Sequence, residues 1–203
     1  MSAVKLDLRK LHRECYQVSD KDFQIVCVPR MQFLMIDGCG DPTKQPQFGQ
    51  CVEALYCVAY TLKFMLKGQH EDYVVPPLEG LWWMDDPHEF SLELKDQWKW
   101  TLMIAQPDFI SAQMVEQAMS QAREKKPLAL LNEVRLASYE EGLACQILHI
   151  GPYENEADVI QRMHAFIHLR GHHLRGKHHE IYMNDPRRLP PDKYKTILRQ
   201  AIM

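Results

Sequence analysis

Apolar and polar residues alternate in the segment FQIVCVPRMQFLMIDG, residues 23–38, as they do along a strand that buries one face. Pro29 lies inside this segment, and proline has no N–H to donate to a sheet ladder. The pattern therefore predicts a sheet edge or a break at Pro29. Because the residues before this segment lack a strong period, we interpret residues 1–30 as an N-terminal extension that packs on something else.

After residue 47 the apolar residues are spaced by three and four, which is typical of an amphipathic helix. We expect this helix over residues 48–67, ending at Gly68. Tyr56, Tyr60 and Phe64 widen its apolar stripe, so we expect other elements to cover the helix on more than one side. The stripe itself consists of Phe48, Val52, Leu55, Ala59, Leu62 and Leu66.

Two later segments, 73–84 and 98–106, are rich in β-branched and aromatic residues and are predicted to be strands. An acidic loop, 85–96, joins them. The segment LNEVRLASYEEGLACQILHIG predicts a hairpin-like pair of strands with Glu140-Glu141-Gly142 at its turn.

The order of the predicted elements repeats along the chain. A strand, a helix and two strands occur twice, with another helix between the two sets. The first set is FLMIDG, 48–67, 73–84 and 98–106, and the second is CQILHIG, 156–170, 177–184 and 195–202. This repeat predicts an α+β fold of tandem pseudo-two-fold β-α-β-β units in a single domain, residues 1–203. We place its halves at 31–126 and 127–203.

Each predicted half has a glycine before its helix, Gly38 or Gly151, and one glutamate among aromatic residues in the strand that follows the helix. The glutamates are Glu79 in LEGLWW and Glu180 in HHEIYM. If the halves are related by a pseudo-two-fold axis, each contributes one carboxylate to a shared pocket.

The composition narrows the class of protein. Of the 203 residues 46% are hydrophobic and 25% are charged, which is ordinary for a globular protein, and no apolar run reaches the roughly 18–20 residues that cross a bilayer. The N-terminus is charged and unlike a signal peptide, so we expect a cytoplasmic protein without a membrane partner. A formal net charge of −3 with dispersed basic residues predicts no nucleic-acid partner, and six cysteines without CxxC spacing are expected to be reduced thiols.

Six segments together resemble the GyrI-like small-molecule-binding family. They are FLMIDGCGDP, EALYCVAYTLKF, YVVPPLEGLWW, WKWTLMIAQPDFI, LHIGPYENE and GKHHEIYMNDPRR. The resemblance covers nearly the whole chain and implies the fold of the effector domains of multidrug-sensing regulators, with aromatic residues around a buried glutamate. It is greatest to long standalone members, some of which are similar to hydrolases that open the cyclopropane of duocarmycin- and yatakemycin-type DNA alkylators.

The resemblance assigns the pocket glutamate to Glu180. Period two in strand 177–184 places His178, Glu180 and Tyr182 on one face and His179 on the other. Apolar walls around Glu180 would raise its pKa, so that it can serve as a general base or as the counter-charge of a cation. We expect Tyr182 or Tyr153 to donate a hydrogen bond to a carbonyl of the ligand.

Aromatic residues on the strands are expected to form a flat stacking surface for a hydrophobic aromatic small molecule, as well as part of the core. The predicted ligand-binding residues are Glu79, Tyr73, Trp82, Trp83, Trp98, Trp100, Tyr56, Tyr60 and His179.

The histidines do not predict a metal site. His164 and His168 are spaced to chelate from one helix face, but no H-E-x-x-H pattern occurs, and His172 and His173 follow Gly171 in a turn. We expect no metal and no organic cofactor, because the relief of ring strain drives the proposed reaction.

The sequence favours a cofactor-independent hydrolase in which Glu180 takes a proton from water. Two other classes stay open. One is a binding module that sequesters cationic or hydrophobic drugs without turnover, since a buried carboxylate serves a cation equally well. The other is an interaction protein whose aromatic strands form a subunit interface.

Overall fold

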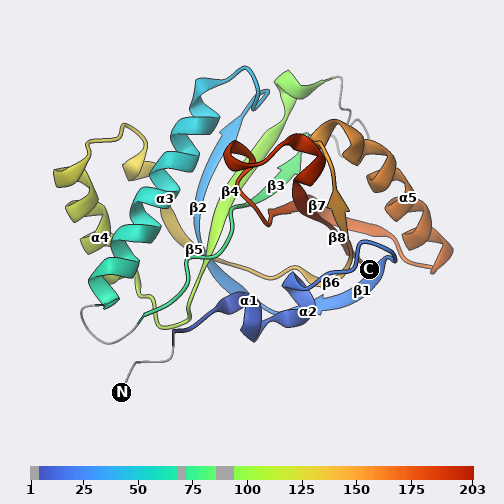
Figure 1. Cartoon of the computed structure of the whole chain (residues 1–203), viewed down its shortest axis with the longest axis horizontal. Helices are drawn as coiled ribbons and strands as arrows, with labels where there is room; N and C mark the ends of the chain where they lie inside the picture. The colour runs from blue at the N-terminus through green and yellow to red at the C-terminus, as the bar shows by residue number, and fades with distance from the viewer. Residues whose placement is uncertain (1–4, 68–71, 86–93) are drawn as a thin grey trace.

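Eight antiparallel strands form one sheet at the centre of the molecule (Figure 1), seen in a computed structural model that describes residues 5–67, 72–85 and 94–203. The order across the sheet is β1-β6-β8-β7-β3-β4-β2-β5. The strands are β1 Gln24–Val28, β2 Met31–Cys39, β3 Glu79–Trp83, β4 Lys99–Gln106, β5 Arg135–Tyr139, β6 Gly142–Ile150, β7 Leu174–Tyr182 and β8 Lys195–Ile202. The α-helices are α1 Leu8–Leu11, α2 Arg13–Tyr16, α3 Pro46–Lys67, α4 Ala112–Lys125 and α5 Glu156–Leu169.

The predicted α+β fold of tandem repeats is confirmed, and each repeat is one strand longer than expected. The strands β1, β2 and β4 have five, nine and eight residues, and so do their counterparts β5, β6 and β8. The additional strands are exchanged between the halves: β1 pairs with β6, and β5 pairs with β2. The predicted hairpin around Glu140-Glu141-Gly142 is therefore wrong, because β5 and β6 pair with other strands rather than with each other.

The two halves meet where β3 pairs with β7. In this pair Gly80 is opposite Glu180, and Glu79 is opposite Ile181. Residues opposite each other share a face, so Glu79 and Glu180 lie on opposite faces of the sheet. The predicted shared pocket with one carboxylate from each half is wrong. The counterpart of Glu79 is instead His179, since each of these two residues is opposite the fifth residue of the last strand in its own half.

The glycine equivalence is also shifted. Gly40 follows the nine-residue β2 as Gly151 follows the nine-residue β6, and both have positive φ, 91° and 141°. Glycine adopts these angles without strain at the exit of each strand. Gly38 has another role, because a Cβ at this position would lie 1.9 Å from Trp100 Cη2. The indole ring of Trp100 thus packs directly on the Gly38 backbone.

Two helices cover one face of the sheet, which we call the helix face. Apolar residues of α3 pack on β2 and β4, and those of α5 pack on β6 and β8. The segment between β7 and β8, with short helices η5 Pro186–Arg188 and η6 Pro191–Lys193, lies between α3 and α5 in Figure 1. α1 and α2 cover the other face, which we call the back face, where Leu8 and Tyr16 pack with Phe33 and Ile181.

The remaining predicted elements are close to those observed. Strand 73–84 is shorter than expected, since only Glu79–Trp83 joins the sheet and Tyr73 makes a single bridge to Leu6. Most of the predicted acidic loop, residues 86–93, lies outside the described residues. None of the helices in the described ranges is long and apolar enough to span a membrane.

Candidate functional site

Glu180 lies on the helix face at the middle of the sheet, between the halves. Tyr182 Oη donates a hydrogen bond of 2.7 Å to Glu180 Oε2. The predicted alternation along this strand is confirmed. His178 and Tyr182 both lie next to Glu180 on the helix face, whereas Ile181 packs in the core of the back face. The side chain of Glu180 is 16% exposed, so its carboxyl group is largely removed from water but remains reachable.

Gly80 provides the space above this carboxyl group. A Cβ at Gly80 would lie 2.8 Å from Trp82 Nε1 and 3.3 Å from Tyr182 Oη, so both polar atoms lie over the glycine. Trp82 Nε1 is buried and has no hydrogen-bond partner among the described residues. An N–H donor, a phenol and a carboxyl group thus converge in one region, as in sites that orient a small molecule.

Aromatic side chains form the wall on the α3 side. Phe48 stacks on Trp82 with 6.1 Å between the ring centroids, and Trp98 meets the same indole edge-on at 5.6 Å. Tyr56 is also on α3, and burial raises its pKa, with smaller and opposite effects from Asp185 and Arg187 of the segment between β7 and β8. This wall is mainly aromatic, which suits an aromatic ligand.

The opposite wall comes from the start of α5. Tyr153, in the short helix η4 Tyr153–Asn155, lies edge-on to Tyr182 at 6.0 Å between ring centroids and 5.2 Å from Tyr194. Burial, with the nearby Glu180 charge, raises the pKa of Tyr182 well above its ordinary value, and burial likewise raises the pKa of Tyr153. Both phenols therefore keep their protons at neutral pH and act as donors.

Glu156, the first residue of α5, is a second carboxyl group of this site. It is 5% exposed, and its Oε1 atom has no hydrogen-bond partner among the described residues. Burial, reinforced by the charge of Glu180, raises the pKa of Glu156 to about 9. The sequence did not predict this role, because an acidic residue in the first turn of a helix is ordinarily exposed and favoured by the helix dipole.

His178, a histidine of the predicted cluster, is also close to Glu180, and His164 is close to His178. His178 Nε2 lies 3.5 Å from Glu180 Oε1, outside hydrogen-bond geometry, and both of its ring nitrogens are buried without a partner in the described ranges. Burial lowers the pKa of His164 to about 4, and the neighbouring His178 acts in the same direction. Among the residues that the structure describes, no group of three or more side chains could hold a metal ion.

Glu79 and His179, both predicted to contact the ligand, lie on the back face instead. Each is 1% exposed. Tyr16 Oη donates to Glu79 Oε1 at 2.7 Å, and His179 Nε2 lies 3.0 Å from Glu79 Oε2. The sheet itself separates these groups from Glu180, so they belong to the structural core beneath α2. The sequence pattern paired Glu79 with Glu180, but Glu180 is opposite Gly80. This shift of one residue puts the two glutamates on different faces of the sheet.

This buried network continues across the back face. His179 Nδ1 lies 2.9 Å from Glu141 Oε2, which also accepts from Arg199 Nη1 at 3.2 Å. Burial opposes charge on each group, but the carboxylates of Glu141 and Glu79 outweigh it and raise the pKa of His179 to about 9. His179 and Arg199 conversely lower the pKa of Glu141 to about 2. Two carboxylates thus balance two cations, and the N-terminal segment is tied to the sheet.

The other predicted aromatic residues divide among the faces and the core. Trp100 and Tyr73 are fully buried in the core under α3, where Tyr73 Oη donates to Gln106 Oε1 at 3.1 Å. Trp83 is on the back face, with Lys177 Nζ 3.2 Å from its ring centroid. Tyr60 is exposed and stacks between Tyr56 and Phe64. The predicted surface of four tryptophans is therefore wrong, since period two separates Trp83 from Trp82.

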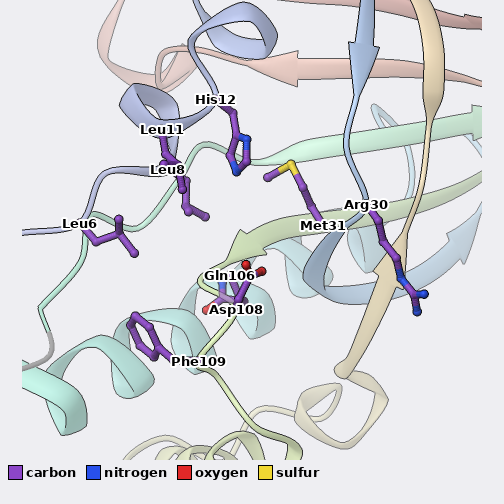
Figure 2. A pocket seen from close by; sticks show the side chains of 9 residues that line it. All are labelled: Leu6, Leu8, Leu11, His12, Arg30, Met31, Gln106, Asp108 and Phe109. Carbon is purple, nitrogen blue, oxygen red and sulfur yellow. The ribbon is translucent and has the colours of Figure 1, made fainter.

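A cavity of about 240 Å³ lies elsewhere, beside α1 and the end of β4 (Figure 2). Its lining includes Leu6, Leu8 and Phe109, with Gln106 as a buried polar side chain. His12, Arg30 and Asp108 also line it, and Gln106 is already hydrogen bonded to Tyr73. We place the candidate site at Glu180 because buried polar atoms without partners gather there, not here.

Comparisons with known proteins agree with this architecture. Residues 21–199 match the family model of the GyrI-like small molecule binding domain. The chain belongs to the GyrI-like family. No curated protein matches the chain.

Solved structures of standalone proteins resemble this GyrI-like protein over nearly its whole length. An uncharacterized conserved protein from Listeria innocua is 39% identical with a TM-score of 0.91, and a hydrolase from the same organism is 38% identical with a TM-score of 0.88. Each comparison covers 98% of this chain and 100% of the other. The C-terminal domain of EcmrR shares the fold at 11% identity, with a TM-score of 0.57 and coverage of 90% and 97%.

Proposed function

We propose that this GyrI-like protein binds a flat, hydrophobic aromatic molecule on the helix face between α3 and α5 and detoxifies it by hydrolysis at Glu180. The observation that carries the proposal is the half-buried Glu180–Tyr182 pair, which lies between aromatic side chains and beside an indole N–H that has no partner among the described residues. The 38% identity to a hydrolase supports turnover over binding alone.

The proposed substrate is a spirocyclopropane conjugated to a dienone, as in duocarmycin- and yatakemycin-type alkylators. Glu180 takes a proton from a water molecule whose oxygen forms a bond to the cyclopropane CH₂. The C–C bond of the ring breaks, and its electron pair moves to the carbonyl oxygen, which becomes a phenol oxygen. A base in this position contributes about 10²–10⁴-fold to the rate.

We propose that, contrary to the expectation from the sequence, Tyr182 does not donate a hydrogen bond to the ligand carbonyl. Its hydroxyl already donates to Glu180, so Tyr182 is a positioning residue that holds the carboxylate toward the ligand. Tyr153, whose ring lies edge-on to Tyr182, remains a candidate donor to the carbonyl. No metal or organic cofactor enters these steps.

Glu180→Gln tests the proposal with a duocarmycin-type spirocyclopropyl dienone as probe. The amide keeps the shape of the side chain but cannot take a proton, so ring opening followed by mass spectrometry should slow by about 10²–10⁴-fold with little change in Kd. Ring opening at the wild-type rate would end this mechanism.

A sequestering module would give a different result. If Glu180 is only a counter-charge, the wild type should bind the probe without opening it, and Glu180→Gln should weaken cationic ligands by about 1.5–3 kcal/mol while leaving neutral ligands unchanged.

A further inference from the structure

Two carboxyl groups of different exposure share the helix-face site. Glu180 is partly exposed and accepts from Tyr182 Oη, whereas Glu156 is 5% exposed and its Oε1 atom has no partner among the described residues. Two carboxylates close together in a region of low dielectric constant cannot both ionise without a large cost. The proton belongs on the more buried group, whose Oε1 atom is unpartnered among the described residues.

We propose that Glu156 is a second catalytic residue, an acid that holds its proton at neutral pH and donates it to the ligand oxygen that gains charge as Glu180 activates water. This inference rests on the function proposed above. It also narrows the substrate class, because a ligand that uses both groups must carry a carbonyl conjugated to the bond that breaks.

The surroundings of Glu156 support this protonation state. The groups that face it are Glu180 and Tyr182 from β7, Thr196 from β8, and Tyr153 and Glu154 from η4, and none of them is a cation. The N-terminus of α5 favours a carboxylate by about 0.3–1 kcal/mol. Thr196 also favours the carboxylate, but burial and the charge of Glu180 outweigh both contributions and raise the pKa of Glu156 to about 9.

The proton balance of the reaction closes with these two residues. Glu180 gains one proton from water, and Glu156 loses one to the phenolate oxygen of the opened ring. Transfer of the proton from Glu180 to Glu156, through Tyr182 Oη or solvent, restores both groups. The net reaction adds one water molecule to the ligand and needs no oxidant or reductant.

Glu156→Gln is the matching variant, because the amide has the shape of the neutral acid but no transferable proton. Asp158→Asn is the control, since Asp158 is in the same first turn of α5 but is exposed and paired with Arg162. With the spirocyclopropyl dienone as probe, we expect turnover to fall by about 10²–10⁴-fold in Glu156→Gln and to stay unchanged in Asp158→Asn.

A second readout does not depend on activity. Infrared difference spectra of the free protein should show a protonated carboxyl band at neutral pH that disappears as pH rises through about 9 and is absent in Glu156→Gln. The same titration should appear as a loss of wild-type turnover above pH 9.

The outcomes separate this inference from the proposed function. A protonated carboxyl band that persists in Glu156→Gln, or a variant that opens the ring at the wild-type rate, would overturn the role of Glu156 alone. A wild type that does not open the ring would overturn the proposed function and the donor role together, while the infrared band would still show where the proton lies.

Discussion

Gly80 lies directly opposite Glu180 where the two halves of the sheet meet, and its missing side chain is the space over which Trp82 Nε1 and Tyr182 Oη converge. A methyl group there would be 2.8 Å from Trp82 Nε1, closer than packed atoms approach. The indole ring cannot easily move, because Phe48 and Trp98 hold it on two sides. The site is thus shaped by a residue without chemistry of its own.

Gly80→Ala should therefore displace Trp82 or Tyr182. Overpacking of this kind costs about 1–3 kcal/mol, and we expect weaker binding of the aromatic probe in addition. Denaturant unfolding and a binding titration measure the two effects. Gly49→Ala is the control: no atom lies within 4 Å of its added Cβ, and alanine in a helix should stabilise by roughly 0.5–1 kcal/mol. Equal changes in stability and in probe binding for Gly80→Ala and Gly49→Ala would contradict the close packing of Trp82 and Tyr182 over Gly80.

The two glutamates should respond to the same change in opposite ways. Glu79→Gln disrupts the buried ion network on the back face, so we expect a loss of about 3–5 kcal/mol in the free energy of unfolding and an unchanged kcat of the folded fraction. Glu180→Gln should lower kcat while the network stays intact. The free energy of unfolding and kcat should be measured for both variants. If folded Glu79→Gln lost as much kcat as Glu180→Gln, the sheet would not separate the two glutamates functionally.

The stability of the protein should depend on pH through His179. Its pKa is raised from 6.5 to about 9, so its contribution is complete below pH 6.5 and is lost as pH rises through about 9, by roughly 3 kcal/mol. Glu156 acts in the same direction between 4.5 and about 9. In acid, Glu141, with its pKa lowered to about 2, loses its contribution as pH falls from 4.5 through about 2.

Urea unfolding between pH 4.5 and 9.5 measures this dependence. The fall in stability above pH 6.5 should be smaller in His179→Gln, although that variant is less stable at every pH because Glu79 and Glu141 lose one of the two cations in the network. A wild type whose stability is flat from pH 6.5 to 9.5 would contradict a charged His179.

Tryptophan fluorescence should report binding through Trp82 and not through Trp83, because these neighbours point to opposite faces. We expect Trp82→Phe to abolish most of the fluorescence change caused by a planar aromatic probe and Trp83→Phe to preserve it. The reverse pattern would place the ligand on the back face.

Local patterns in the sequence predicted the elements well and the relations between distant elements poorly. The helical spacing from Phe48 and the alternation around Glu180 depend only on neighbours, and both are confirmed. The equivalence of Glu79 and Glu180 depended on register, and a shift of one residue moves a side chain to the other face. The hairpin at Gly142 failed because both of its strands find partners far away in the chain.

Glu156 shows a different limit. Whether an acidic residue at the start of a helix is solvated or enclosed depends on what packs over it, and here Glu180, Tyr182 and Tyr153 come from other elements. The aromatic residues around Trp82 were predicted as a set, but the sequence does not show which ring fills the core and which borders the site.

The exchange of β1 and β5 between the halves also affects how the chain can fold during its synthesis on the ribosome. β1 is synthesised early and pairs with β6, in which Gln146 is opposite Gln24. β6 emerges from the ribosome only after the whole first half has been synthesised. Contacts so distant in sequence form slowly, and domains otherwise tend to fold as the chain appears. The nascent first half thus has to wait with β1 unpaired and the edge of β2 open, which makes this interval the time when the chain is most exposed to aggregation and to chaperones.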